Sequence, residues 1–394
     1  MLSKRIKNMT PSATSELFAE VARLREAGVD VISFNVGEPD FPTPVKIRDA
    51  CKRALDEGKT KYASVSGITP LKEVICDKFL QDNQIIYEKD QICISTGGKQ
   101  AIYNAVMAVC DPGDEVLLPT PCWVSYVEMI KLAQGIPVLV PPLNNYQLDL
   151  ETIKNRITKK TKAIIINTPN NPTGICYTEE SLRELGNLAV EYGFYIISDE
   201  VYEKLVYDGN RHVCIAGLSE DIYKQSIIVN GFSKSHSMTG WRIGYTAASK
   251  EIIRGITSLQ GHITSNRTTF VQWAALEGLK SCNQSVMEMK EEFQKRRDYM
   301  YQTINAFPGI ECMKPEGAFY LMPDVHAYFG KKAGDRVIQN ADDFCLYMLE
   351  EANIAMVPGT AFWIPNTVRL AYTDSLDRLQ EGMERFRKAL KKLN

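Results

Sequence analysis

The sequence predicts an α/β protein in which a mostly parallel, seven-stranded sheet carries helices on both faces and is joined to a smaller α+β domain. Seven short runs of β-branched and other apolar residues occur between residues 92 and 248. Segments with helical periodicity separate these runs, which is typical of a parallel sheet. The pattern changes after Gln260, and 394 residues exceed what one compact core usually holds.

Each of the seven runs is short enough for a strand and ends near glycine, proline or polar residues. In chain order they are ICIS (92–95), EVLLP (115–119), IPVLVP (136–141), KAIIINT (162–168), FYIISDE (194–200), SIIVNGF (226–232) and RIGYTAA (242–248). Helical patterns such as KQAIYNAVMAV (99–109) and ESLRELGNLAVEYG (180–193) lie between them. Folds of this kind bind their ligands beyond the carboxyl ends of the strands.

The second domain is predicted from a different succession of elements. A long helical pattern over 286–307 precedes three short strand patterns, and an amphipathic helical pattern over 375–390 closes the chain. The three strand patterns are GAFYLMP (317–323), IAMVPG (354–359) and TVRLAYT (367–373). This succession favours an α+β arrangement.

The composition excludes several classes of function. The 46 basic residues nearly balance the 48 acidic ones, so no attraction to nucleic acid or to an anionic membrane is expected. Ten scattered cysteines and four histidines show no metal-ligand spacing, and the cysteines are expected to be reduced core residues. The charged start lacks the apolar run of a signal peptide, and no membrane-spanning run occurs. We therefore expect a cytoplasmic protein, without a metal, that acts on a small molecule.

A first candidate site lies where the first strand meets the next helix. Thr96, Gly97 and Gly98 occupy this turn, and free N–H groups at a helix N-terminus can hold a phosphate. A Gly-Gly pair before a helix is also often only a tight turn, so both interpretations stay open on the local sequence.

Two further strand ends carry polar side chains. Asn171 follows the strand at 162–168 in a loop that prolines restrict, although a plain connecting loop explains this segment almost as well. Asp199 ends the strand at 194–200. An acid in that place is often a helix cap, but it could also meet the protonated nitrogen of a ligand.

Lys234 is the most informative candidate. Most lysines are exposed, but this one follows an apolar strand and should reach the sheet edge that also carries Asp199 and Asn171. Burial near Arg242 would lower its pKa and favour the neutral amine that attacks a carbonyl. Arg242 and Ser233 could share a phosphate with the glycine turn. A phosphate, a reactive carbonyl and a ring nitrogen in one site describe pyridoxal phosphate.

The chain resembles the class I pyridoxal-phosphate aminotransferases, whose fold is also called fold type I. The resemblance covers the whole chain and rests on SKSHSMTGWRIGY (233–245), NTPNNPTG (167–174), SDEVYE (198–203) and GEPDFPTP (37–44), in the family's order. It implies a large cofactor-binding domain over 46–285 and a small α+β domain over 286–394. The segment 1–45 is expected to belong to the small domain.

The resemblance also implies the roles of the cofactor-binding residues. Lys234 would be the catalytic Schiff-base lysine and proton carrier, and Asp199 would hold the pyridine nitrogen. Asn171 and Tyr202 would contact the phenolic oxygen of the ring, and Trp123 would stack on the ring. The residues implied at the phosphate are Gly97, Gly98, Ser233, Arg242 and, from the neighbouring subunit, Tyr62. The last of these implies a homodimer with shared active sites.

The same resemblance implies how the substrate is held. Arg369 matches the arginine that binds the α-carboxylate, and Asn171 and Trp123 would contact the substrate as well. Gly37 matches a glycine whose backbone borders the substrate, although by itself it reads as a turn.

PSAT (11–14) and GGKQ (97–100) are similar to the subgroup of bacterial-type aspartate aminotransferases. There Lys99 and Thr14 would recognise the distal carboxylate, so the substrates would be L-aspartate and 2-oxoglutarate. Members that also aminate prephenate often have a lysine before the PSAT proline, where this chain has Thr10.

Three alternatives stay open. The chain could be an aminotransferase for other amino acids (aromatic, alanine) or prephenate, or a carbon–sulfur lyase that releases ammonia and pyruvate without a keto-acid acceptor. A non-enzymatic, cofactor-binding regulatory module would need an attached DNA-binding segment, and the length leaves little room for one.

Overall fold

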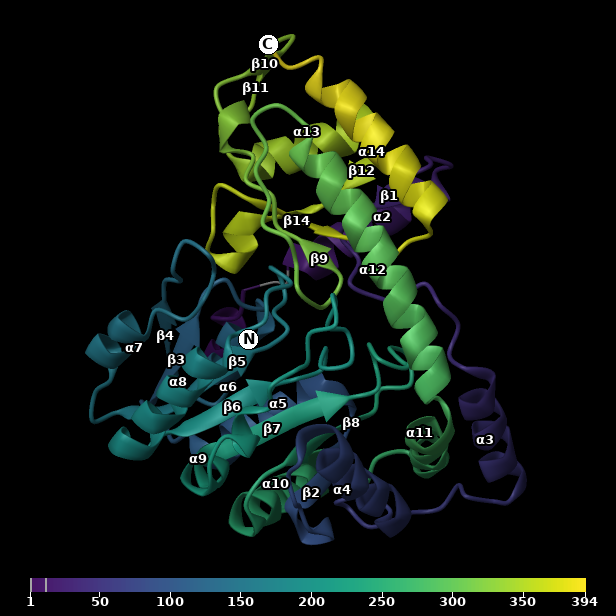
Figure 1. The fold of residues 1–394 in the computed structure, drawn as a ribbon, viewed down its shortest axis with the longest axis vertical. Helices are drawn as coiled ribbons and strands as arrows, with labels where there is room; N and C mark the ends of the chain where they lie inside the picture. Colours follow the sequence, from purple (N-terminus) through teal and green to yellow (C-terminus); the bar gives the residue numbers. More distant parts are fainter. Residues whose placement is uncertain (1, 11–12) are drawn as a thin grey trace.

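The computed structural model of the protein describes residues 2–10 and 13–394, apart from the side chains of residues 13–16 and 18. In Figure 1 the central sheet occupies the lower part of the molecule, and α12–α14 with the short strands β9–β14 occupy the upper part. No helix in the described part of the chain is both long and apolar enough to cross a membrane.

The central sheet has seven strands, and the prediction of a mostly parallel sheet is confirmed. Their order across the sheet is β2 (Ile92–Ser95), β8 (Gly244–Ala247), β7 (Ser226–Gly231), β6 (Tyr195–Asp199), β5 (Thr161–Asn167), β3 (Glu115–Pro119) and β4 (Ile136–Val140). Only β8 runs antiparallel to its neighbours. The parallel strands β5, β6 and β7 therefore end at one edge of the sheet.

Helices cover both faces of this sheet because successive strand residues point to opposite sides. Ile164 and Ile166 of β5 pack in one apolar cluster, whereas Ala163 and Ile165 pack in another. The first cluster includes α3 (Val45–Asp56), α4 (Thr69–Asn83), α7 (Leu150–Arg156), α8 (Glu179–Tyr192) and α11 (Thr269–Ser281). The second includes α5 (Gly97–Val109), α6 (Ser125–Leu132) and α10 (Lys250–Ile263). The short α9 (Glu220–Gln225) packs beside α8.

The upper part has its own core and its own small sheets. A three-stranded sheet joins β13 (Val357–Pro358), β14 (Val368–Ala371) and β9 (Tyr320–Leu321), and β1 (Ile32–Ser33) pairs in parallel with β12 (Ile354–Ala355). The helices packed in this part are α2 (Ala13–Glu26), α12 (Asn283–Asn305), α13 (Ala341–Ala352) and α14 (Leu376–Leu390), and β10 (Lys332–Ala333) and β11 (Arg336–Val337) form a hairpin. The domain boundaries predicted at residues 45 and 285 remain predictions.

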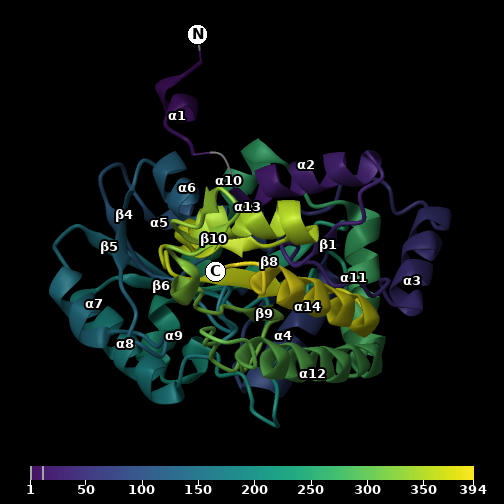
Figure 2. The same ribbon diagram turned by 90° about the horizontal axis from the view of Figure 1, so that it is seen from above.

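The amino end of the chain approaches both parts of the molecule. Helix α1 (Lys4–Lys7) stands apart from the rest in Figure 2, and α2 lies close to α13. The segment after β1 then passes between the two parts: the backbone nitrogen of Ala371 donates to the oxygen of Phe34, and the Lys234 side chain reaches Gly37. The residues after β1 can therefore contribute to a site at the sheet edge.

Candidate active site

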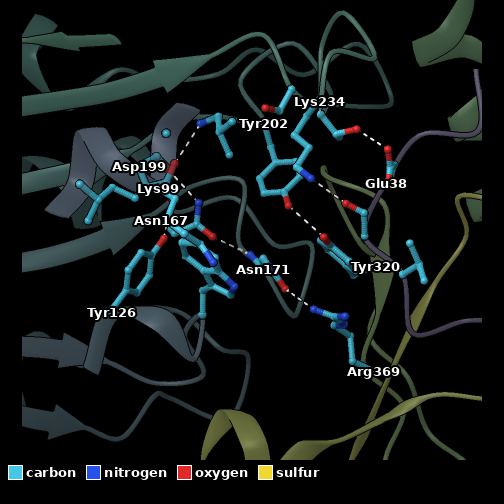
Figure 3. A pocket seen from close by; sticks show the side chains of 18 of the residues that line it. Glu38, Lys99, Tyr126, Asn167, Asn171, Asp199, Tyr202, Lys234, Tyr320 and Arg369 are labelled. Carbon is cyan, nitrogen blue, oxygen red and sulfur yellow. Dashed lines mark hydrogen bonds between the residues drawn. The ribbon is translucent and has the colours of Figure 1, made fainter. Parts of the chain in front are cut away.

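A cavity of about 490 Å³ lies at the carboxyl ends of β5, β6 and β7, below the three-stranded sheet. Figure 3 shows its lining side chains pointing toward one another from these strand ends and from the upper part. The lining residues include Gly37, Gly98, Lys99, Trp123, Asn171, Asp199, Tyr202, Ser233, Lys234, Arg242 and Arg369. Eleven of the predicted site residues thus meet in one cavity.

Lys234 lies in the turn that follows β7, and its side chain crosses the cavity. Its Nζ donates a hydrogen bond of 2.6 Å to the carbonyl oxygen of Gly37. Burial, together with the positive charges of Arg242 and Arg369, lowers the pKa of the Lys234 ammonium to about 8, although the Glu38 carboxylate opposes the shift. A fraction of Lys234 is therefore the neutral amine near neutral pH.

Asp199 ends β6 on the floor of the cavity. Its Oδ2 accepts a hydrogen bond of 2.7 Å from the Tyr126 hydroxyl, and its Oδ1 accepts from the backbone nitrogen of Val201 at 3.3 Å. Burial raises the pKa of the Asp199 carboxyl to about 6, and these two hydrogen bonds limit the rise. The site therefore holds a carboxylate that a cationic group could stabilise further.

Arg369 reaches the cavity from β14 and is buried. Its guanidinium donates to Asn171 Oδ1 at 3.0 Å and to the Asn35 carbonyl oxygen at 2.8 Å, and it lies 4.7 Å from the centre of the Tyr320 ring. Its Nε has no hydrogen-bond partner, and no ion pair to Arg369 occurs within the described chain. A buried guanidinium with a free donor is suited to an anionic ligand.

Asn171 and Tyr202 face the cavity through networks of hydrogen bonds. The backbone nitrogen of Asn171 donates to Asn167 Oδ1 at 2.7 Å, which fixes the loop after β5. The Tyr202 and Tyr320 hydroxyl groups are 2.9 Å apart. In Figure 3 the Tyr202 ring lies beside the Lys234 side chain, whereas Asn171 lies between Asn167 and Arg369.

The glycine turn and Arg242 form a cradle on the side of the cavity near α5. Gly97 has φ +78°, and a Cβ atom there would lie 2.8 Å from a terminal nitrogen of Arg242. The Arg242 side chain therefore lies against the N-terminus of this 13-residue helix, with the buried Ser233 in the same cavity wall. Guanidinium and helix N–H groups together favour a phosphate.

Lys99 and Trp123 lie together at the rim of the cavity. Lys99 Nζ is 4.7 Å from the centre of the Trp123 ring, and Trp123 packs edge-on against Tyr126. Burial and the nearby Arg242 lower the pKa of Lys99. This arrangement adds a cation at the opening of the cavity.

Thr14, Tyr62 and Gly37 differ from the other predicted residues in where they lie or in what they contact. The side chain of Thr14 lies outside the described part of the structure. Tyr62 does not line the cavity and is 91% exposed, as a residue that serves a second subunit would be, and its role remains a prediction. Gly37 lies so close to Tyr320 that a Cβ atom there would overlap the tyrosine hydroxyl oxygen.

Six polar residues of the cavity were not among the predicted site residues: Asn35, Glu38, Tyr126, Asn167, Thr239 and Tyr320. Asn167 ends a predicted strand and Glu38 lies in the quoted GEPDFPTP motif, so both had a usable signal. Tyr126 and Tyr320 lie in apolar stretches, where an aromatic residue usually belongs to the core. Their hydroxyl groups became evident only from their partners in space.

Comparisons with known proteins agree with this geometry. A family model described as aminotransferase class I and II matches residues 29–386. The chain is 46% identical to an aspartate aminotransferase of Bacillus subtilis over 99% of each chain. It is also 46% identical to a probable aspartate/prephenate aminotransferase of Aquifex aeolicus, over 100% of this chain and 99% of that protein.

Two solved structures extend the similarity to the fold. The aspartate aminotransferase of Rhizobium meliloti superposes with a TM-score of 0.96 at 36% identity over 100% of both chains. The aspartate aminotransferase of Thermus thermophilus with maleate gives a TM-score of 0.93 at 38% identity over 99% of both chains.

Proposed function

The chain belongs to the class I and II aminotransferase family, and we propose that it is an aspartate aminotransferase that uses pyridoxal 5'-phosphate to move the amino group of L-aspartate to 2-oxoglutarate. The products would be oxaloacetate and L-glutamate. One observation carries the proposal: Lys234, whose pKa is lowered, the buried carboxyl of Asp199 and the buried Arg369, which has no ion pair in the described chain, line one cavity.

The residues of the cavity fit this cofactor. Arg242, Ser233 and the N-terminus of α5 would hold the phosphate, and Gly97 leaves the space that a Cβ atom would fill. Trp123 would stack on the ring, and Asn171 and Tyr202 would hold its phenolic oxygen. When bound, the cofactor supplies a carbonyl that reacts with amines and a pyridinium ring that accepts the charge left by removal of an α-proton.

Asp199 would keep the proton on the ring nitrogen. A cation beside Asp199 would favour the ionised carboxylate, because opposite charges in a buried site lower the pKa of an acid. The Tyr126 hydroxyl, 2.7 Å from Oδ2, holds the carboxylate in place and stabilises its charge.

Lys234 would act as the base. Its lowered pKa leaves part of the amine neutral near pH 8, so Nζ can accept the α-proton of the substrate and return it later. The carbonyl oxygen of Gly37 and the turn after β7 hold this side chain inside the cavity.

Arg369 would bind the substrate's α-carboxylate. Its Nε is free, and a charge-assisted hydrogen bond contributes roughly 1.5–3 kcal/mol. Asn171 already contacts this guanidinium and would lie beside the same carboxylate. The backbone of Gly37 would border the substrate on the other side.

Lys99 would bind the distal carboxylate and thus select dicarboxylic substrates, with Thr14 as its partner. The Thermus neighbour was solved with maleate, a dicarboxylate, which supports this choice. Prephenate is the second candidate substrate, because several relatives are named aspartate/prephenate aminotransferases. Thr10, in the place of the lysine found in many such members, argues against it.

A substrate comparison tests the proposal. The purified enzyme is supplied with 2-oxoglutarate and either L-aspartate, L-alanine or L-phenylalanine, and glutamate is measured; prephenate is tested as an alternative acceptor. We expect kcat/KM to be highest for aspartate, and we expect Lys99→Met to lower it for aspartate by at least about ten-fold while changing the alanine value little. A higher kcat/KM for another amino acid would contradict the proposal that L-aspartate is the substrate. Release of pyruvate without a keto-acid acceptor would indicate a lyase.

We also propose a homodimer in which Tyr62 of each chain serves the cavity of the other, and a cytoplasmic location. Tyr62 supports the dimer, because its side chain is exposed and does not line the cavity of its own chain. Sedimentation of the purified protein tests the assembly, and fractionation of cells tests the location. A monomer that binds the cofactor with full affinity would contradict the shared site.

A further inference from the structure

Arg267 lies just before α11 and has no place in the site described above. Its guanidinium donates to three acceptors: Nε to the carbonyl oxygen of Arg242, one terminal nitrogen to the carbonyl oxygen of Trp241, and the other to Thr268 Oγ1. Its own carbonyl oxygen accepts from Gln272 Nε2 at 2.6 Å, and Gln272 is buried in α11. Arg267 therefore links helix α11 to the backbone of Trp241 and Arg242, the turn from which the Arg242 side chain extends.

The backbone of Arg242 needs such support. Arg242 has φ +53°, in the left-handed region, where a residue with a side chain loses roughly 1–2 kcal/mol. From this conformation its side chain lies against Gly97, and one terminal nitrogen donates to the carbonyl oxygen of Thr239 at 2.9 Å. A relaxed backbone at Arg242 would point the guanidinium elsewhere.

The charges around Arg267 indicate that the turn at Trp241 and Arg242 is suited to a bound anion. Burial, followed by the charge of Arg242, lowers the pKa of Arg267 to about 10. Arg242 also lowers the pKa values of Lys99 and Lys234, so Arg242 lies among three other cationic side chains: Lys99 and Lys234 in the cavity, and Arg267 outside it. In the described parts of the chain, neither Arg242 nor Arg267 forms an ion pair with a carboxylate. An anion bound here would offset this concentration of positive charge.

Resting on the proposed function, we propose that Arg267 is a positioning residue for the cofactor phosphate. By donating to the Trp241 and Arg242 carbonyl oxygens it holds the left-handed turn from which Arg242 reaches the phosphate cradle. Its action passes through Arg242 and the backbone, so it requires the planar, multiple donors of a guanidinium and not only a positive charge.

The test compares two ligands that differ only in the phosphate. Full-length protein freed of its cofactor is titrated with pyridoxal 5'-phosphate and with pyridoxal, and the visible absorption band that each develops on binding gives its affinity. The variants are Arg267→Gln, Arg267→Lys, which keeps the charge, and Arg254→Gln on α10, an exposed arginine that controls for the loss of one cation.

We expect Arg267→Gln to weaken pyridoxal 5'-phosphate binding by about ten-fold or more while pyridoxal binding stays within about two-fold of the wild type. Arg267→Lys should resemble Arg267→Gln, and Arg254→Gln should resemble the wild type. Three results would overturn the proposal: unchanged phosphate-ester binding in Arg267→Gln, an equal loss for both ligands, or full affinity in Arg267→Lys. If the wild-type protein itself binds neither ligand, the proposed function fails instead.

Discussion

At the scale of single residues, the site is defined by charges that the fold has removed from water. Burial is the largest cause of the shifted pKa in Lys234, Asp199 and Arg369, and in each case it disfavours the charged form. Such groups destabilise the protein in the absence of a ligand, and a ligand of complementary charge would relieve this cost. Perturbed ionisable groups that share a cavity are typical of functional sites.

The raised pKa of Asp199 gives a prediction about stability. The pKa of the Asp199 carboxyl rises from 3.8 to about 6 on folding, so the folded protein holds this proton more tightly than the unfolded chain does. The stability that this proton provides is complete below about pH 4 and is lost as the pH rises through 6. An asparagine side chain in the same place cannot ionise. Between pH 4.5 and pH 8, cofactor-free Asp199→Asn should therefore gain about 2 kcal/mol in unfolding free energy relative to the wild type.

Urea unfolding at several pH values measures this difference. Asp335→Asn, in the exposed hairpin between β10 and β11, is the control for the loss of one carboxyl group. A difference between Asp199→Asn and the wild type that stays constant with pH, or that shrinks as the pH rises, would contradict the account of Asp199.

Sequence reasoning placed Lys234, Asp199 and Asn171 together because each follows an apolar strand, and parallel strands end at one edge of a sheet. It could not place Tyr126 and Tyr320. Both are buried aromatic residues, and each contacts the site through a hydroxyl group whose partner is distant in sequence: Asp199 for Tyr126 and Tyr202 for Tyr320. Contacts of that kind depend on packing between elements.

At the scale of elements, the turn between β2 and α5 shows how backbone conformation serves the site. Gly97 adopts a positive φ, which glycine permits at little cost, and it thereby leaves room for the Arg242 guanidinium. On the local sequence alone, a plain tight turn was the more frequent interpretation. The contact with Arg242, 145 residues further along the chain, is what distinguishes a cradle from a turn.

Gly97→Ala should therefore weaken binding of pyridoxal 5'-phosphate by at least about ten-fold, because the new methyl group displaces Arg242 and adds backbone strain. Gly113→Ala provides a matched control. Gly113 also has a positive φ, +90°, but a Cβ atom there would meet nothing within 4 Å.

Titration of the cofactor-free variants gives both affinities, and thermal unfolding shows whether the backbone cost is similar. Equal cofactor affinity in the Gly97 and Gly113 variants would show that the contact with Arg242 does not matter.

The strand patterns predicted the central sheet well because buried parallel strands form continuous apolar runs. The upper part was harder to predict. The run at 354–359 divides into β12, which pairs with β1, and β13, which pairs with β14. Two-residue strands that change partners have too little periodicity to be recognised, and Pro358 cannot donate to a ladder.

At the scale of the whole molecule, two bodies of structure meet over the site. The sheet edge contributes Lys234 and Asp199, whereas the upper part contributes Arg369 and Tyr320 (Figure 1, Figure 3). The resemblance predicted this arrangement from motifs spread over the whole chain, which local patterns alone could not. The proposed dimer would add a third source of residues.

Mixed dimers test that contribution. A Lys234→Ala chain and a Tyr62→Ala chain, each impaired alone, are produced together with different tags, and the mixed dimer is purified. If Tyr62 acts on the neighbouring cavity, one cavity of the mixed dimer keeps both residues and the other loses both. The mixed dimer should then show about half the activity of the wild type.

If Tyr62 acts within its own chain, neither cavity of the mixed dimer is complete. Activity at the level of the Tyr62→Ala homodimer, or below it, would therefore contradict the shared site. A Lys234→Ala chain paired with a wild-type chain is the control, because one intact cavity is present there in either case.

The most direct measurement is the visible absorption spectrum of the purified protein with pyridoxal 5'-phosphate, before and after L-aspartate is added. The account predicts a band that depends on Lys234, that aspartate removes more readily than L-alanine or L-phenylalanine does, and that 2-oxoglutarate restores. Its absence in Lys234→Ala is part of the prediction. A wild-type protein without this band, or a Lys234→Ala variant with the same band and the same response, would contradict the account.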